Sequence, residues 1–295
     1  MTTEKTTWLT LLEFPHLNQL TLRSVDIVPE SSLHGFLSRC PVLESLTLMS
    51  VNISESGLLS VLSSCPVLRS LSLQHNTTGH SRIRITSSSL QRLVITKSNR
   101  LPQDPFEVIV ENAPSLERLV PPDGWFNVRV IHAPKLNMLR LRLETKVFMN
   151  SKPVSLNNAM RGVKILTLMT AHAPHLVIHF LRRFPCVEHL YFTVSKIEEN
   201  PLIENVQPNT SLECLDAHLK TLCLTQYRGY KAQVKLIRFF LLNAKVLESM
   251  KLVVNRSKYM CDNEWIARQY KELQLDNRAS QGAKFDFERS HLFPV

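Results

Sequence analysis

Three histidines and a cysteine between residues 172 and 186 are residue types that bind transition metals. His172, His175 and His179, in AHAPHLVIHF, have a spacing that can gather them on one side of a helix. Cys186, the nearest thiol, follows Pro185 beyond that segment. Because zinc sites usually add carboxylate or thiolate ligands and a supporting shell, we expect ordinary surface and half-buried histidines here. We therefore predict no metal site and no cofactor.

Catalytic motifs are missing from the sequence. There is no GxSxG, phosphate-binding loop, HExxH or glycine-rich dinucleotide turn, and the 295 residues include only 7 glycines. Glu198 and Glu199 are adjacent, so on a helix or a strand they cannot both face one substrate. We therefore expect no catalytic residue and predict that the protein is not an enzyme.

The net charge of +10 raises the possibility of nucleic-acid binding. It comes from 35 Lys and Arg against 25 Asp and Glu, and the surplus is spread evenly along the chain without a long basic run. Evenly spread charge is typical of a solvated surface, so a basic nucleic-acid-binding repeat protein is kept only as an alternative.

We find no pattern of a targeting signal and no membrane-spanning segment in the sequence. The start, MTTEKTTWLTLL, lacks the pattern of a signal peptide, and the most apolar window, residues 236–247, is too short to cross a bilayer. The six cysteines form no CxxC pair. We expect an intracellular monomer, cytoplasmic or nuclear, with its thiols packed as small hydrophobic groups and no membrane partner.

A leucine ladder recurs through the chain. FPHLNQLTL (14–22), CPVLESLTL (40–48), CPVLRSLSL (65–73), APSLERLVP (113–121) and APKLNMLRL (133–141) are its clearest copies, and five degenerate copies follow the same pattern. A ladder of the LxxLxL type at intervals of 20–32 residues is the signature of leucine-rich repeats.

The residue types of the ladder predict the structure of one repeat. The two leucines of LxL enter the core because strand side chains alternate, and the proline ends the preceding helix. Segments such as SSLHGFLSR (31–39) and SESGLLSVLSS (54–64) have helical periodicity. One strand and one helix per repeat predict an α/β solenoid, a curved parallel sheet with outer helices, over residues 8–200.

The central repeats look irregular. KSNRLPQDPFEVIVEN (97–112) carries loop or distorted-repeat signals, and WFNVRVIHAP (125–134) alternates like a strand in a hairpin-like excursion.

Three stretches give the chain a family resemblance. They are the CPVLESLTL repeats with their helices, the block HLKTLCLTQYRGYKAQVKLIRFFLLNAKVLESMKLVV (218–254) and the tail NRASQGAKFDFERS (277–290). The chain resembles the plant, grass-type F-box/FBD/leucine-rich-repeat proteins, and the second stretch resembles their FBD motif. On this reading residues 8–207 are leucine-rich repeats, and residues 208–295 are an FBD-like α+β region that caps the solenoid.

The resemblance implies the receptor half of a cullin-RING ubiquitin ligase, in which an F-box binds the linker subunit and the repeats hold the target. No segment of this sequence fits an F-box, so we expect a non-enzymatic protein-interaction module whose target is unidentified, and we do not expect the linker subunit as a partner. The alternative is a truncated ligase adaptor that misses its F-box.

Target binding is expected on the concave strand face, where outward-pointing residues form rows. Arginine and tyrosine are favoured binding anchors, and small hydroxyl residues occupy the N-terminal rows. The predicted protein-binding residues are Arg140, Arg142, His189, Tyr191, Ser45, Thr47, Ser70 and Ser72.

Overall fold

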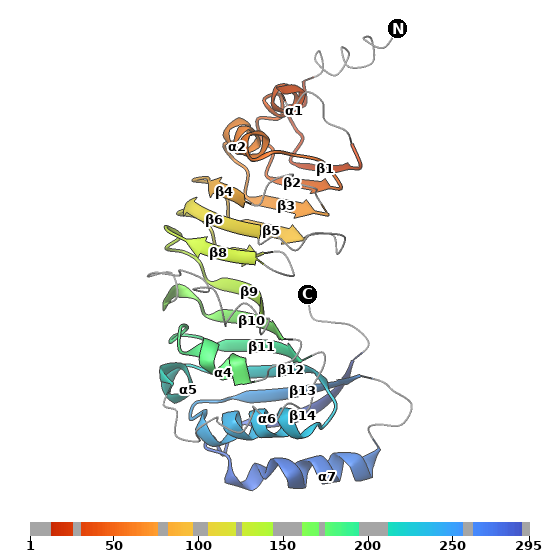
Figure 1. Cartoon of the computed structure of the whole chain (residues 1–295), viewed down its shortest axis with the longest axis vertical. Coiled ribbons are helices and arrows are strands. Elements are labelled where there is room, and N and C mark those ends of the chain that lie inside the picture. Colours follow the sequence, from red (N-terminus) through yellow and green to blue (C-terminus); the bar gives the residue numbers. More distant parts are fainter. Residues whose placement is uncertain are drawn as a thin grey trace. The chain divides into compact units, whose positions relative to one another are not determined.

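The structure is a computed structural model and describes residues 13–25, 31–75, 82–96, 106–121, 126–143, 161–170, 175–194, 212–255 and 262–290. These residues form two compact units. We call the described residues from 13 to 137 unit 1 and those from 138 to 290 unit 2. Each unit contains a parallel sheet whose strands come from successive leucine ladders (Figure 1).

The main sheet of unit 1 has the strand order β1-β2-β3-β5-β7. Its strands pair in parallel and in register, so that Leu20 lies beside Leu46, Leu46 beside Leu71 and Leu71 beside Leu93. These leucines lie on one face, and the three of them from β2 to β5 are fully buried. The strands are β1 (Gln19–Arg23), β2 (Ser45–Met49), β3 (Ser70–Gln74), β5 (Arg92–Thr96) and β7 (Arg118–Val120).

The proline of each ladder lies in a tight turn that leads into the strand. The amide of Leu43 donates to the carbonyl of Cys40 at 3.1 Å, and Leu68 repeats this with Cys65. An i to i+3 bond with proline at the second position is a turn that the ring's fixed φ favours. The residue before the proline is Cys40 in one copy and Cys65 in the other. Both cysteines are buried and are free thiols, which fits a requirement for a small side chain at this position.

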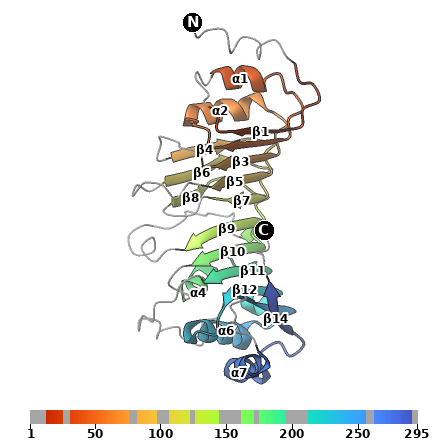
Figure 2. The same ribbon diagram turned by 90° about the vertical axis from the view of Figure 1, so that its right-hand side faces the viewer.

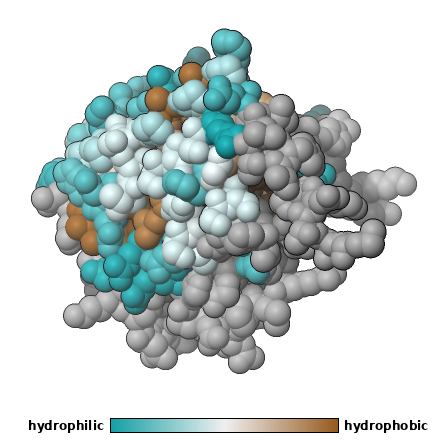
Figure 3. All heavy atoms as spheres, turned by 90° about the horizontal axis from the view of Figure 1, so that it is seen from above, coloured by the Kyte–Doolittle hydropathy of each residue, from teal (hydrophilic) through white to brown (hydrophobic). Residues whose placement is uncertain are grey.

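Two helices cover the core face of the first strands. They are α1 (Ser31–Leu37) and α2 (Glu55–Ser64), as the sequence predicts. Ser54 caps α2, because its Oγ accepts a hydrogen bond from the amide of Gly57 at 3.0 Å. Leu58, Val61 and Leu62 face the core at helical spacing. Seen from above, the described residues show hydrophobic groups in separate places among residues of hydrophilic and intermediate hydropathy (Figure 3).

The central repeats of unit 1 depart from the prediction. A second parallel sheet, with the order β4-β6-β8, takes the place expected for helices and lies beside the main strands (Figure 2). Its members are β4 (Arg82–Thr86), β6 (Phe106–Asn112) and β8 (Phe126–Val130).

This sheet corrects two expectations. Residues 106–112 are a strand rather than a loop, and residues 126–130 pair in parallel with β6 rather than in a hairpin. The physical reason is a period of two: in RIRIT (82–86) Ile83 and Ile85 are buried between exposed arginines. A helix would bring those arginines toward the core, whereas a strand keeps them in water.

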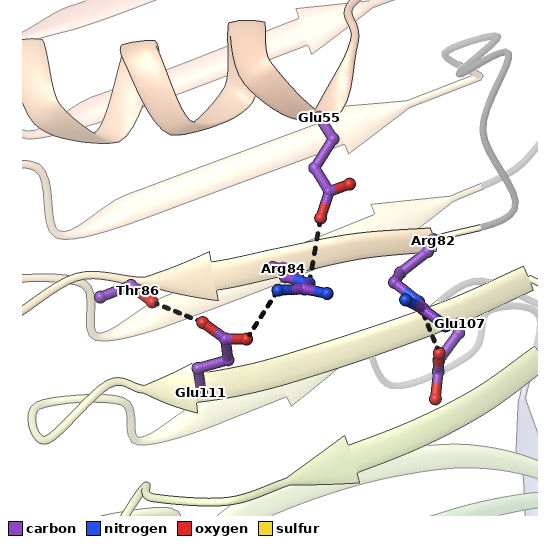
Figure 4. A network of polar contacts seen from close by, with 6 residues as sticks. All are labelled: Glu55, Arg82, Arg84, Thr86, Glu107 and Glu111. Carbon is purple, nitrogen blue, oxygen red and sulfur yellow. Dashed lines mark hydrogen bonds and ion pairs between the residues drawn. The ribbon is translucent and has the colours of Figure 1, made fainter.

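Charged side chains join this second sheet to α2 (Figure 4). Arg84 lies 3.4 Å from Glu55 of α2 and 3.5 Å from Glu111 of β6, and Arg82 lies 2.8 Å from Glu107. Thr86 also donates to Glu111 at 3.5 Å. The network holds neighbouring elements on the outer side of unit 1.

Unit 2 continues the repeat with six parallel strands in the order β9-β10-β11-β12-β13-β14. Helices α4 (His175–Leu181), α5 (Glu213–Ala217) and α6 (Lys231–Asn243) lie between successive strands in the chain. Large buried rings fill its core, among them Phe180, Phe184, Phe192 and Phe240. The strands are β9 (Met138–Leu143), β10 (Ile165–Thr170), β11 (His189–Val194), β12 (Thr221–Tyr227), β13 (Ser249–Asn255) and β14 (Lys284–Ser290).

The end of unit 2 is covered by α7 (Asn263–Leu273), which is followed by the short helix η4 (Leu275–Asn277). Trp265 of α7 packs against Tyr227 and against Phe287 of β14, with ring centroids 6.0 and 5.7 Å apart. Tyr270 packs against Phe285 and Phe287. The helix therefore covers the aromatic side of the last strand.

Candidate binding face and family

The candidate site is the sheet face opposite the helices, which we call the open face. Because strand side chains alternate, the residues between the core leucines all point to this side. It is considered separately in unit 1 and in unit 2.

Unit 1 carries the predicted hydroxyl residues on the open face in two rows. Ser45 pairs with Ser70, and Thr47 pairs with Ser72, and all four are half-buried. Gln74 donates to Ser72 at 3.0 Å. The rows thus form a shallow, polar surface with side chains small enough to leave the sheet accessible.

Beyond these rows, arginine replaces serine in the same register. Arg92 lies beside Ser70, and Arg118 lies beside Arg92, and both side chains are exposed. Arg118 was not among the predicted binding residues. Its place on the open face follows from the ladder APSLERLVP, in which it stands one position before the first strand leucine.

Unit 2 brings the predicted Arg140 and Tyr191 into one row. Arg140 pairs with Thr167 of β10, and Thr167 pairs with Tyr191 of β11. Two strand spacings separate Arg140 from Tyr191, a distance of about 10 Å. His189 lies two residues before Tyr191 and on the same face, so the three side chains share one surface.

The guanidinium of Arg140 is poorly satisfied. Its Nη2 donates to the sulfur of Met169 at 3.2 Å, and a thioether is a weak acceptor. Its Nε is buried and has no hydrogen-bond partner among the described residues. The side chain of Arg142 lies outside the described residues, although its backbone pairs with Met169.

Toward the last strands, side chains of the open face are buried or pair with one another. Thr193 and Thr225 are buried and their hydroxyls hydrogen-bond to each other at 2.5 Å. Lys251 of β13 donates to Glu288 of β14 at 3.3 Å. Glu288 was missed because KFDFER was not assigned as a strand; its alternating aromatic and charged residues were the available signal.

The histidines considered for metal binding are not tested by the structure, because His172 and the side chains of His175 and His179 lie outside the described residues. Cys186 lies close to Glu213 and His218, two residues that were not considered. No helix in the described part of the chain is both long and apolar enough to cross a membrane.

Family comparison agrees with this repeat architecture. The family model described as the leucine-rich repeats of FBD-associated F-box protein At5g56370 matches residues 2–51 and 43–192. The chain belongs to this leucine-rich-repeat family. A second model, FBD, matches residues 207–252, which include β12 and α6.

These matches confirm the predicted resemblance to F-box/FBD/leucine-rich-repeat proteins and the predicted fold class. Repeats and FBD regions of this family are typical of interaction modules rather than of enzymes. Comparison with curated proteins gave no match.

Proposed function

We propose that this leucine-rich-repeat/FBD protein binds a protein target on its open face and performs no catalysis. Arg140, Arg142, His189 and Tyr191 are the binding residues of unit 2. Ser45, Thr47, Ser70 and Ser72 are those of unit 1. Residues 8–207 form the recognition repeats, and residues 208–295 form the FBD region and cap.

The unsatisfied guanidinium of Arg140 is the observation that carries this proposal. A buried donor without a partner costs free energy, about 1–3 kcal/mol, and a rotation of the half-buried side chain that turns Nε toward an incoming acceptor removes that cost. A carboxylate is the strongest such acceptor, because it can accept two parallel hydrogen bonds from arginine. The target is therefore expected to present an acidic side chain to Arg140.

Tyr191 supplies the second part of the contact. It is half-buried on β11, two strands from Arg140 in the same row, and offers an aromatic ring with a polar end. Tyrosine and arginine dominate binding energy at protein interfaces because they combine contact area with directed hydrogen bonds. We expect an apolar target residue about 10 Å from the acidic one to cover this ring.

Affinity capture from plant tissue followed by mass spectrometry tests the proposal. The Arg140→Ala/Tyr191→Ala variant should recover the target at least tenfold less than the wild type, as expected for losing two anchor residues. Arg228→Ala/Tyr230→Ala is the matched control, because this arginine and tyrosine are exposed in the loop between β12 and α6, where Arg228 donates to the hydroxyl of Tyr230 at 3.4 Å. Equal recovery by the wild type and by the Arg140→Ala/Tyr191→Ala variant would contradict the proposal.

A second candidate function is that of a truncated substrate adaptor of a cullin-RING ubiquitin ligase that misses its F-box. The description of the matching family as F-box proteins favours it. Because no segment of this sequence fits an F-box, the purified chain should not bind the purified ligase linker subunit in a pull-down. A complex between the two would show that the chain itself couples to the ligase and would contradict this expectation.

A further inference from the structure

Three potential metal ligands from separate parts of the sequence meet in unit 2. They are Cys186, in the turn between α4 and β11, Glu213, the first residue of α5, and His218, which follows α5. The thiol sulfur, a carboxylate oxygen and an imidazole nitrogen all lie within 4.8 Å of one another. No repeat position requires these three residue types, so the leucine ladder does not explain their meeting.

The ligand set matches the chemistry of zinc. Zn²⁺ takes Cys sulfur at about 2.3 Å, and His nitrogen or carboxylate oxygen at about 2.0–2.2 Å, in a tetrahedral arrangement. Ligand atoms around one tetrahedral ion lie about 3–4 Å apart, so the three groups need small side-chain rotations to close on it. A fourth position would remain for water or for a group from another molecule.

The fold holds two of the three ligands on one short rigid element. Leu212 to Leu219 form a compact turn in which the amides of His218 and Leu219 both donate to the carbonyl of Cys214, at 3.0 and 2.7 Å. Leu212, Leu215 and Leu219 are buried and anchor this turn in the core. Glu213 and His218 therefore project from a fixed backbone toward Cys186.

The surrounding charges are largely paired. Glu188 forms ion pairs with Lys164 at 2.9 Å and with Lys220 at 3.3 Å. Glu213 contacts Arg161 at 3.4 Å, with both side chains mostly exposed, and such a pair is weak enough to yield to a metal ion.

We propose that Cys186, Glu213 and His218 form a binding site for one Zn²⁺ ion, which clips the turn before β11 to helix α5. This site is separate from the open face and revises the expectation that the protein binds no metal. Because the thiol and the imidazole must lose their protons to bind, the affinity for Zn²⁺ rises with pH.

Titration of the metal-free full chain with Zn²⁺ in a calorimeter tests the site. The expected result is saturable binding of one Zn²⁺ ion per chain. The affinity for Zn²⁺ should be at least tenfold lower in Cys186→Ser and in His218→Asn. Co²⁺ should give a thiolate-to-metal absorption band in the wild type that is absent in Cys186→Ser. His75→Asn is the matched control, since His75 is an exposed histidine of unit 1 with φ 52°, a backbone conformation that asparagine tolerates. The affinity of this variant for Zn²⁺ should equal that of the wild type.

A measurement on the wild-type chain keeps the test independent of variant folding. Cys186 is half-buried, whereas Cys40, Cys65, Cys214 and Cys223 are buried. Alkylation of the native protein should therefore label Cys186 ahead of these four, and Zn²⁺ should slow that labelling at least tenfold. Absence of saturable Zn²⁺ binding, unchanged binding in both site variants, or labelling of Cys186 unaffected by Zn²⁺ would each overturn the proposal.

Discussion

The hydroxyl of Tyr227 donates a hydrogen bond of 2.5 Å to Oε1 of Gln269, 42 residues later in the chain. Tyr227 ends β12 and is fully buried, and Gln269 is buried on α7. Nε2 of Gln269 also donates to Glu272 at 3.3 Å. The pair fastens the capping helix to the FBD-matched strand through a polar contact inside an aromatic core.

Replacing Gln269 with alanine should destabilise the protein by about 1–3 kcal/mol, because the buried hydroxyl of Tyr227 would lose its acceptor. Urea unfolding followed by circular dichroism measures this loss. The double variant Tyr227→Phe/Gln269→Leu removes both polar groups and should recover most of the stability. If Gln269→Ala and the double variant are equally destabilised, the hydrogen bond is not the cause.

Gly229 should not tolerate a side chain. Its φ is +74°, and a Cβ there would lie 2.8 Å from Oε1 of Gln269. Gly229→Ala is expected to cost about 1–2 kcal/mol from the left-handed backbone alone, with a further loss if Gln269 is displaced from Tyr227. Gly282→Ala, where a Cβ meets nothing within 4 Å, is the control and should leave the thermal midpoint within a few degrees of the wild type. Equal midpoints for both variants would refute this reading of Gly229.

Alkaline pH should weaken the fold through Cys214. Burial raises the pKa of its thiol from 9.0 to about 12, with smaller additions from Asp216 and Glu213 that oppose the effect of backbone hydrogen bonds. The folded state therefore keeps the proton that the unfolded state loses, and stability is complete below pH 9 and declines between pH 9 and 12. The slope from this thiol is at most about 1.4 kcal/mol per pH unit.

Unfolding free energies measured from pH 8 to pH 10.5 check this decline. Cys214→Ala should show a shallower fall than the wild type over that range. A Cys214→Ala slope as steep as that of the wild type would show that other groups cause the alkaline loss.

The charge network of Figure 4 should contribute modestly and depend on salt. Arg84 contacts both Glu55 and Glu111 while about half of its side chain is exposed, so Arg84→Met should cost about 1 kcal/mol. Because screening weakens exposed ion pairs, the difference from the wild type should shrink in 1 M salt. Arg39→Met serves as a control outside the network and should show no salt-dependent difference; the same behaviour in both variants would count against a role for the network.

Local patterns were sufficient for much of the fold. The leucines of CPVLESLTL and its copies placed Leu46, Leu71 and Leu93 in the core, because alternation and a proline turn are properties of adjacent residues. The same alternation placed Ser45, Thr47, Arg140 and Tyr191 on the open face. Their role in binding a target stays a prediction.

The second sheet of unit 1 was beyond the repeat argument. An average repeat predicts a helix between strands, but the alternating isoleucines of β4 and valines of β6 overrode that expectation. Their period of two was present in the sequence, while their parallel pairing was not, because partner strands are more than 20 residues apart.

The sequence by itself determined the repeat, the direction of its leucines and the family. Only the tertiary structure decided which distant side chains meet: Tyr227 with Gln269, Arg84 with Glu55, and Cys186 with Glu213 and His218. The physical reason is that periodicity fixes the face of a residue within its own element, whereas a contact between elements depends on their register, turns and packing.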